Sequence, residues 1–190
     1  EIIKRVHSAG VIGAGGAGFP TYKKLEAVVD TVIANGVECE PLLHTDKAIM
    51  ENYAGEVISG LRLAIKATGA KRGVVAMKKG YDAIAAALNC EIRETDGIDL
   101  QLFDHFYPAG DEFVVVYEVT GKIIPEGNLP LSVGVLVQNV ATLRNIHDAV
   151  SGESVIQKVV TIGGEVRKPQ VVNVPVGATY RDLIQLAGGA

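Results

Sequence analysis

The stretch "GVIGAGGAGFP", residues 10–20, decides which nucleotide-binding fold this chain can adopt. Gly13, Gly15 and Gly18 have the G-x-G-x-x-G spacing of dinucleotide-binding turns. In a Rossmann turn a helix begins at about the second glycine, so Pro20 would lie inside that helix and break it. A proline also keeps the residue before it extended. The stretch therefore predicts a different loop that holds a phosphate or a flavin, with a plain flexible turn as the alternative.

The residues inside this loop suit an anionic ligand. Consecutive glycines such as Gly15 and Gly16 let backbone N–H groups converge on a charged group and let the backbone approach it closely. Phe19 stands at the exit of the loop, where its ring can either stack on an aromatic ligand or pack in the hydrophobic core. Both positions of Phe19 stay open at this point.

The composition is that of a folded protein without a nucleic-acid partner. Of the 190 residues, 48% are hydrophobic and 21% charged, which supports a real core in one domain of ordinary size with a small second one. The net charge of −4 and the absence of like-charge runs argue against nucleic acid as a partner.

The number of cysteines and the hydropathy of the chain indicate the cellular compartment. Cys39 and Cys90 are too few and too far apart to form an iron–sulfur or zinc ligand set, and such sparse cysteines are typical of a reducing compartment. No apolar run reaches the roughly 18 residues that span a bilayer, and the first residues lack a signal-peptide pattern. We expect a cytoplasmic protein, in contact with a membrane only through partners or enclosed in a microcompartment.

Hydrophobic periodicity predicts alternating strands and helices in the first 152 residues. A β-branched run at 31–36 and apolar patterns at 72–79 and 99–104 indicate strands, separated by helical patterns at 46–68 and 81–88. This alternation predicts an α/β fold with a mostly parallel sheet flanked by helices.

Further elements complete this part of the chain. Residues 110–121 contain a valine run typical of a strand, but their acidic start and closing glycine favour a helix. Thr21 and Asp46 are expected to cap the helices that follow them. The remaining expectations are helices at 1–10, 21–28 and 138–150 and loops at 37–45 and 123–135.

The pattern of predicted elements changes after residue 152. Two strand patterns at 159–166 and 170–177 are followed by a helical pattern at 179–189. So short a unit buries little surface by itself, and we expect it to pack on the first part. We therefore divide the chain into domains at 1–152 and 153–190.

Two acidic stretches follow predicted strands. In "ANGVECEP" (34–41), Asn35 ends a strand and carries Glu38 and Glu40 into a loop, where ligands bind in open α/β sheets. In "YPAGDE" (107–112), Asp111 and Glu112 open the helix predicted at 110–121. The alternatives are a solvated acidic loop for the first stretch and a helix N-terminus stabilised by acids for the second.

A third stretch, "VQNVAT" (137–142), places Gln138 and Asn139 at a strand-to-helix junction, where the two amides either contact a ligand or cap the helix. No catalytic constellation accompanies these stretches. The four histidines are isolated, and neither a nucleophile elbow nor a Walker loop is present.

Taken in order, these stretches resemble one family. "GAGGAGFPTYKKL" (13–25), "NGVECEP" (35–41), "YPAGDE" (107–112) and "VGVLVQNVATL" (133–143) are similar to the flavin- and NADH-binding 51-kDa subunit of respiratory complex I. They are still more similar to the C subunit of Rnf electron-transport complexes and to the Rnf-C-like flavoproteins of propanediol-utilisation microcompartments, which are considered cobalamin reductases. The tail at 161–189 resembles part of an SLBB module, a β-grasp fold.

The resemblance implies an NADH-oxidising electron-transfer flavoprotein. NADH would pass a hydride to FMN, and electrons would leave for 4Fe-4S clusters outside this segment, in other electron-transfer subunits or a downstream acceptor such as a corrinoid. The protein would supply binding contacts and no catalytic side chain. The cofactor-binding residues carried over by position are Gly13, Gly15, Gly16, Gly18, Phe19, Lys24, Asn35, Glu38, Glu40, Asp111, Glu112, Gln138 and Asn139.

Three positions depart from the complex I pattern. Ala14 replaces an arginine, Val37 replaces an aspartate, and Asp111 replaces a glutamate. Val37 removes one polar flavin contact. This change motivates an alternative function, a non-catalytic scaffold or a partner- or corrinoid-binding module that has lost tight FMN binding.

Overall fold

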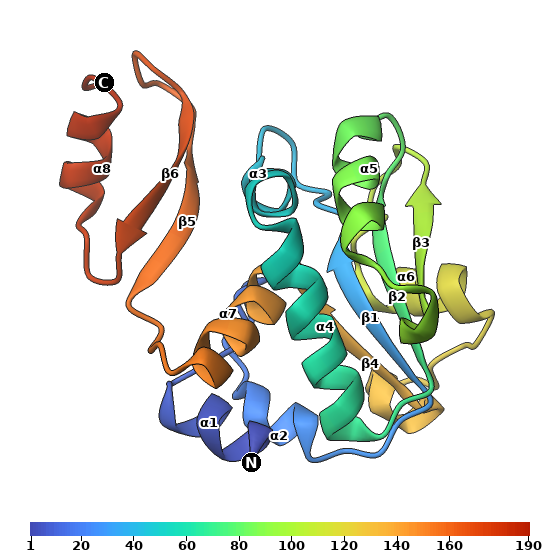
Figure 1. The fold of residues 1–190 in the computed structure, drawn as a ribbon. Helices are drawn as coiled ribbons and strands as arrows, with labels where there is room; N and C mark the ends of the chain where they lie inside the picture. Colours follow the sequence, from blue (N-terminus) through green and yellow to red (C-terminus); the bar gives the residue numbers. More distant parts are fainter.

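The larger part of the molecule is built on a four-stranded parallel sheet (Figure 1). The computed structural model describes all 190 residues. Strands stand in the order β3-β2-β1-β4, so that β1 and β4 are neighbours although most of the domain separates them in sequence. The prediction of a mostly parallel α/β sheet flanked by helices is confirmed. The strands are β1 (Thr31–Gly36), β2 (Arg72–Lys78), β3 (Ile98–Phe103) and β4 (Val135–Asn139).

Helices cover the two faces of the sheet unequally. Along β1, Val32 and Ala34 point into a cluster of 22 buried residues on one face, whereas Ile33 points into a cluster of 12 on the other. Burial of both faces explains why this strand is a continuous apolar run. The smaller cluster lies under α6 (Glu112–Thr120). The larger lies under α1 (Ile2–Ser8), α2 (Thr21–Leu25), α3 (Thr45–Asn52), α4 (Ala54–Thr68), α5 (Asp82–Glu91) and α7 (Val140–Ser151).

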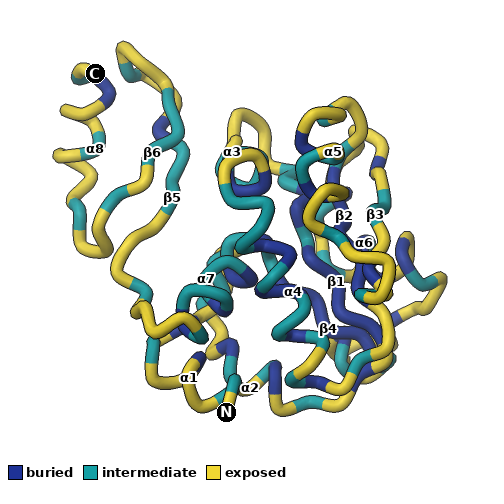
Figure 2. Tube along the Cα trace, in the orientation of Figure 1, coloured by how far each residue is buried: buried dark blue, intermediate teal, exposed yellow.

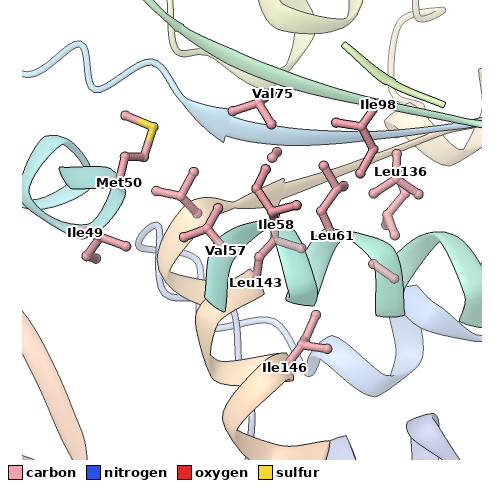
Figure 3. Packing of buried hydrophobic residues seen from close by; sticks show 14 of the residues in the cluster. Ile49, Met50, Val57, Ile58, Leu61, Val75, Ile98, Leu136, Leu143 and Ile146 are labelled. Atoms are coloured by element: carbon pink, nitrogen blue, oxygen red, sulfur yellow. The ribbon is translucent and has the colours of Figure 1, made fainter. Parts of the chain in front are cut away.

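Helices α4 and α7 cross at very short range in the centre of the larger cluster (Figure 3). A Cβ atom placed on Gly60 of α4 would lie only 1.9 Å from the carbonyl oxygen of Leu143 in α7. The glycine therefore allows the two backbones to touch, and Leu61 and Ile146 pack beside the crossing. Because α7 directly follows β4, this crossing fixes the edge of the sheet where β4 ends.

The helix predicted over 46–68 is wrong in one respect, because it is divided into α3 and α4. Tyr53 between them has φ −136° and ψ 36°, which is not helical. The Tyr53 ring lies against the guanidinium of Arg144, with 3.6 Å between Cζ and the ring centroid. Arg144 belongs to α7, which is far from Tyr53 in the sequence. The hydrophobic periodicity around residue 53 therefore does not reveal this contact.

The predicted caps are also corrected. Pro20 precedes α2, so Thr21 is its first residue, and the Thr21 hydroxyl is buried without a hydrogen-bond partner. Asp46 lies inside the first turn of α3, and the Thr45 N–H at the start of that helix donates to Glu38 instead.

The ambiguous segment 110–121 forms a helix, as predicted: α6 ends at Thr120 and is followed by Gly121, which has φ +69°. The strand β4 was expected only as the start of the strand-to-helix junction at 137–142, without bounds of its own. It spans Val135–Asn139 and overlaps the ends of the loop expected at 123–135 and of the helix expected at 138–150. A buried strand of five residues shows no alternation of polar and apolar side chains, so the pattern does not give its bounds.

The C-terminal part is an antiparallel pair, β5 (Gln157–Ile162) and β6 (Gln170–Pro175), followed by α8 (Tyr180–Leu186). This is the predicted strand–strand–helix order. Figure 2 shows this part as mostly exposed or intermediate, and α8 has no buried residue. Hydrogen bonds join it to the larger part at two points: the Val155 N–H donates to the Ala9 carbonyl, and Thr161 contacts the start of α3. In addition, the Val155 and Val159 side chains pack against the larger cluster. The division at residues 152 and 153 stays a prediction.

Every helix of the structure is too short or too polar to cross a membrane.

Candidate functional site

A cleft of about 630 Å³ opens where β1 and β4 end. The glycine loop at 13–19, the acidic loop after β1, the segment 110–112 and the end of β4 form its walls, and β5 closes one side. Of the thirteen residues that the sequence predicts for the site, only Gly18 lies outside the lining. The other twelve are Gly13, Gly15, Gly16, Phe19, Lys24, Asn35, Glu38, Glu40, Asp111, Glu112, Gln138 and Asn139.

The glycine loop is a tight hairpin with free N–H groups. An isolated β-bridge between Ile12 and Pro20 closes it, and the Gly13 N–H donates to the Phe19 carbonyl at 2.8 Å. Gly16 and Gly18 have φ +122° and +63°, which favour glycine. The N–H groups of residues 15 to 19 donate to no acceptor in the protein. Such a row of unpaired N–H groups is an anion-binding arrangement.

The loop rests on the N-terminus of α7. The Ala14 N–H donates to Thr142 Oγ1 at 2.9 Å, and Thr142 is fully buried in the first turn of α7. A Cβ on Gly15 would come within 3.2 Å of Asn139 Cβ, so the loop lies directly on the residue that caps the helix. The positive end of the α7 dipole therefore adds to the free N–H groups of the loop.

The asparagines at the ends of β1 and β4 use their amides inside the protein. Asn35 Nδ2 donates to the Gly110 carbonyl at 2.9 Å, and Asn35 Oδ1 accepts from the Val37 N–H at 3.0 Å. Asn139 Oδ1 accepts from the Ala141 N–H as a helix cap, while Asn139 Nδ2 donates to an Asp46 oxygen at 2.9 Å. Both residues line the cleft, but their first role is to hold its walls together.

A carboxylate pair occupies the wall between the acidic loop and α3. Glu38 Oε1 accepts from the Thr45 N–H at 2.8 Å and from the Asp46 N–H at 3.2 Å, so Glu38 is the cap of α3. Burial, helped by the neighbouring Glu38 charge, raises the pKa of Asp46 to about 7 against the opposing effect of the Asn139 hydrogen bond. Asp46 is thus a carboxyl that is still partly protonated near neutral pH.

The segment 110–112 approaches β1 closely. A Cβ on Gly110 would lie 1.9 Å from the Val37 carbonyl oxygen, so only glycine fits there. Asp111 Oδ1 caps α6 by accepting from the Phe113 and Val114 N–H groups, which agrees with the helix-N-terminus alternative for this stretch.

Gln138 is the one predicted residue whose polar atom is buried without a partner. It is 3% exposed, lines the cleft, and its Nε2 has no hydrogen-bond acceptor. An unpaired buried donor is costly, and a ligand oxygen in the cleft would satisfy it. Lys24, in contrast, already donates to the Val137 carbonyl at 3.4 Å and lies 3.9 Å from Glu112.

Phe19 is 47% exposed and lines the cleft, so its ring is not part of the hydrophobic core, and stacking on a ligand stays a prediction. Sequence reasoning missed Asp46, Thr142 and the β5 residues 158–161 as parts of the cleft. Thr142 lay inside a quoted stretch, but no local signal in β5 indicates that this strand reaches the site.

These features define a parallel α/β domain with a glycine-rich anion-binding loop at the ends of two adjacent strands. The chain belongs to the family of Nuo51 FMN-binding domains, which matches residues 6–148. The SLBB domain family matches residues 159–190. Membership makes it an FMN-binding flavoprotein domain of the oxidoreductase and electron-transport class, as the resemblance implied.

Curated relatives cover the whole chain. It is 43% identical over 190 residues to cobalamin reductase PduS of Citrobacter freundii, which includes 100% of this chain and 42% of the relative. It is 33% identical over 194 residues to the C subunit of the Na⁺-translocating ferredoxin:NAD⁺ oxidoreductase complex of Acetobacterium woodii, with 99% of this chain and 44% of the relative covered. The chain thus spans less than half the length of the curated relatives it matches.

The fold also occurs in a solved structure. A chain of NAD⁺-reducing [NiFe]-hydrogenase in the air-oxidized state superposes with a TM-score of 0.85, 24% sequence identity, and coverage of 98% of this chain and 38% of the other. The likeness supports the architecture of both parts of the molecule.

The residues in the cleft fit FMN. The free N–H groups of residues 15 to 19 and the α7 N-terminus suit a phosphate monoester. The unpaired Gln138 Nε2 suits a carbonyl or hydroxyl oxygen, and the exposed Phe19 ring suits a face of an aromatic ring system.

Proposed function

We propose that this chain is the electron-entry module of an NADH-oxidising flavoprotein, with FMN and NADH bound side by side in the cleft. The observation that carries the proposal is the run of unpaired backbone N–H groups at residues 15 to 19, of which Gly15, Gly16, Ala17 and Phe19 line the cleft, seated on the N-terminus of α7. The loop and the helix together would hold the FMN phosphate.

The remaining contacts follow from what each residue has free. Gln138 Nε2 would donate to the flavin, and Phe19 would cover the nicotinamide side. The Glu40 side chain has no hydrogen bond to the protein, although its backbone carbonyl accepts from the Leu43 N–H, so its carboxylate is available to the ribose hydroxyls of NADH. Gly13, Gly15 and Gly16 would admit the cofactor closely, while Asn35, Glu38, Asp111 and Asn139 would hold the walls.

Bound FMN would supply the redox chemistry, taking a hydride from NADH and releasing electrons singly to 4Fe-4S clusters outside this segment. The protein's part would be to bind and orient the two ring systems and to keep them together. No side chain in the cleft has to donate or accept a proton for this exchange. Other electron-transfer subunits or a downstream acceptor would then receive the electrons.

The test is a titration of the purified chain with FMN, followed by anaerobic addition of NADH. The proposal expects quenching of flavin fluorescence on binding and bleaching of flavin absorbance by NADH. A folded sample that binds no FMN at high micromolar concentration would contradict it.

One observation favours the alternative of a scaffold or corrinoid-binding module. Val37 is buried at 3% exposure where the complex I pattern has an aspartate, so that position offers no polar contact to a flavin. The same titration separates the two functions, because a scaffold leaves flavin unbound and unbleached. Binding of a corrinoid by the FMN-free chain would then support the alternative directly.

A further inference from the structure

A carboxyl group with one free oxygen lies in the wall of the cleft, on Asp46. Its Oδ2 accepts from Asn139 Nδ2 at 2.9 Å, whereas its Oδ1 has no hydrogen bond in the protein. Asn139 is also the residue on which the glycine loop rests, since a Cβ on Gly15 would lie 3.2 Å from Asn139 Cβ. The Asp46 carboxyl is therefore separated from the anion-binding loop by one side chain.

The cations on the elements packed against α3 do not pair with Asp46. On α3 itself, Lys47 Nζ lies 4.9 Å from the centroid of the Tyr81 ring, and the His44 side chain just before α3 lines a second cavity, between α3 and β6. On α7, the Arg144 guanidinium stacks on the tyrosine between α3 and α4, and Lys158 of β5 is exposed. The carboxyl therefore has no counter-ion.

Glu38 is the one charged group that acts on Asp46. Its Oε1 accepts from the N–H groups of Thr45 and Asp46, so the N-terminus of α3 stabilises the Glu38 anion. The acids on α7 and α4, Asp148 and Glu56, interact with each other, and β1 carries no charged residue. Asp46 has one neutral amide as its partner, so it is the member of the pair that keeps a proton. Burial, and after it the Glu38 charge, raises the pKa of Asp46 to about 7.

A phosphorylated ligand would raise the affinity of Asp46 for its proton. The positive end of the α7 dipole lies at Asn139 and favours the anionic form of Asp46. A phosphate on the free N–H groups of the glycine loop would compete for that positive end and add negative charge near the carboxyl. Because Oδ2 already accepts from Asn139, the proton resides on Oδ1, which can donate it in a hydrogen bond to a ligand oxygen.

We propose that Asp46 binds a nucleotide in the cleft as a neutral carboxylic acid, donating from Oδ1 to an acceptor oxygen of the ligand. Above neutral pH, each nucleotide that binds then brings about one proton with it from the solvent, and this proton converts the Asp46 carboxylate into the acid. This inference rests on the proposed function for the identity of the nucleotide. The acceptor oxygen belongs either to a phosphoryl group or to a ring carbonyl, and the experiment distinguishes them.

The experiment is calorimetry of FMN binding at pH 6 and pH 8 in buffers of different ionisation enthalpy, which counts the protons taken up. Wild type should take up about one proton more per FMN than Asp46→Asn at pH 8, and equal numbers at pH 6. The phosphate of FMN titrates in both proteins, so its own protons cancel in the difference. Since the amide resembles the neutral acid, Asp46→Asn should bind FMN about 10-fold more tightly than wild type at pH 8.

Riboflavin identifies the acceptor. If Oδ1 donates to a phosphate oxygen, wild type and Asp46→Asn take up equal numbers of protons with riboflavin, whereas a ring carbonyl preserves the difference. The matched control is Asp82→Asn, which removes an acid from the first turn of another helix, α5, outside the cleft. It should take up as many protons as wild type with every ligand.

Equal proton uptake by wild type and Asp46→Asn with FMN at pH 8 would overturn the inference. The ¹³C resonance of the Asp46 carboxyl in wild type decides it without a variant, because a carboxylate resonance in the FMN complex at pH 8 would overturn it as well. If wild type binds no FMN, the proposed function fails, and the same comparison with NADH decides the role of Asp46. Absence of binding for both nucleotides would overturn both.

Discussion

At the residue scale, the cleft separates side chains that build its walls from those left free for a ligand. Three of its lining side chains already make hydrogen bonds to a neighbouring backbone or side chain: Asn35, Asn139 and Glu38. Gln138 does not, because its Nε2 has no partner in the protein. Substitutions of the first three residues should affect folding and binding together, whereas substitution of Gln138 should affect binding alone.

Gln138→Met tests this separation. The substitution keeps the shape of the side chain and removes an unpaired buried donor, so the free energy of unfolding should stay equal or rise by about 1 kcal/mol. Binding of FMN should weaken, because the donor is lost to the ligand. Urea unfolding and flavin titration measure the two effects. A loss of stability without a loss of affinity would show that Nε2 serves the fold.

Gly15→Ala tests the seat of the glycine loop. The new Cβ would lie 3.2 Å from Asn139 Cβ and push the loop off the α7 N-terminus by a few tenths of an ångström. We expect FMN affinity to fall about 10-fold with little loss of secondary structure. Gly163→Ala is the control, because nothing lies within 4 Å of a Cβ there. Equal affinities of both variants and wild type would refute the close contact.

Asp46 predicts a pH dependence of stability. Its pKa is raised to about 7 in the folded protein and has its ordinary value of 3.8 in the unfolded chain. The folded state therefore holds the proton over a range in which the unfolded state has lost it. The stability contribution is fully present below pH 4 and is lost as the pH rises to 7, roughly 4 kcal/mol in all.

The variant Asp46→Asn removes this titration and keeps the hydrogen-bonding shape. The difference in free energy of unfolding between wild type and variant should change with a slope of about 1.4 kcal/mol per pH unit between pH 4 and 7, then level off. Denaturant unfolding at several pH values measures it. A constant difference over that range would mean that Asp46 titrates normally.

At the element scale, the close crossing of α4 and α7 places the N-terminus of α7 under the glycine loop. Gly60 makes that crossing possible, because its position leaves no room for a side chain. The position of the anion-binding loop therefore depends on a glycine in the hydrophobic core, far from any ligand. Core packing and ligand geometry are linked through one helix.

Gly60→Ala should destabilise the protein by about 3 kcal/mol, since the added methyl group would force two backbones apart. Gly55→Ala in the same helix is the matched control. A Cβ there would meet only the flexible carboxylate of Glu91, at 3.5 Å, so the higher helix propensity of alanine should leave stability unchanged or improved. Thermal unfolding compares the two, and similar melting temperatures would argue against the crossing.

Elements were predicted well where the signal is local and poorly where it is tertiary. The helix over 110–121 follows from its acidic start and closing glycine, and the strand at 31–36 from its apolar run. The break at Tyr53 depends on Arg144 from a distant helix, and β4 is too short for its pattern to give its bounds. In the candidate site, motifs identified the lining, but not which amides are already bonded nor that β5 forms a wall.

At the scale of the whole molecule, the C-terminal module lies against the larger part at few points. The hydroxyl of Thr161 provides two of the hydrogen bonds that hold it. Thr161→Val should remove both and leave the shape of the strand intact. We expect faster amide hydrogen exchange in β5 and weaker nucleotide binding, with β1 to β4 unchanged. The control is Thr95→Val, at an exposed position in the short helix 94–96 where the Thr95 hydroxyl makes no hydrogen bond. Equal exchange in both variants would refute the docking role of Thr161.

The position of β4 beside β1 has a consequence for how the holoprotein is made. Asn35 and Asn139 are register neighbours although most of the domain separates them in sequence, and the cleft lies at their ends. During synthesis the glycine loop and β1 emerge long before their partners β4 and α7. A nascent chain therefore has no complete site until β4 and α7 have emerged, and we expect flavin to be acquired only after that point of synthesis.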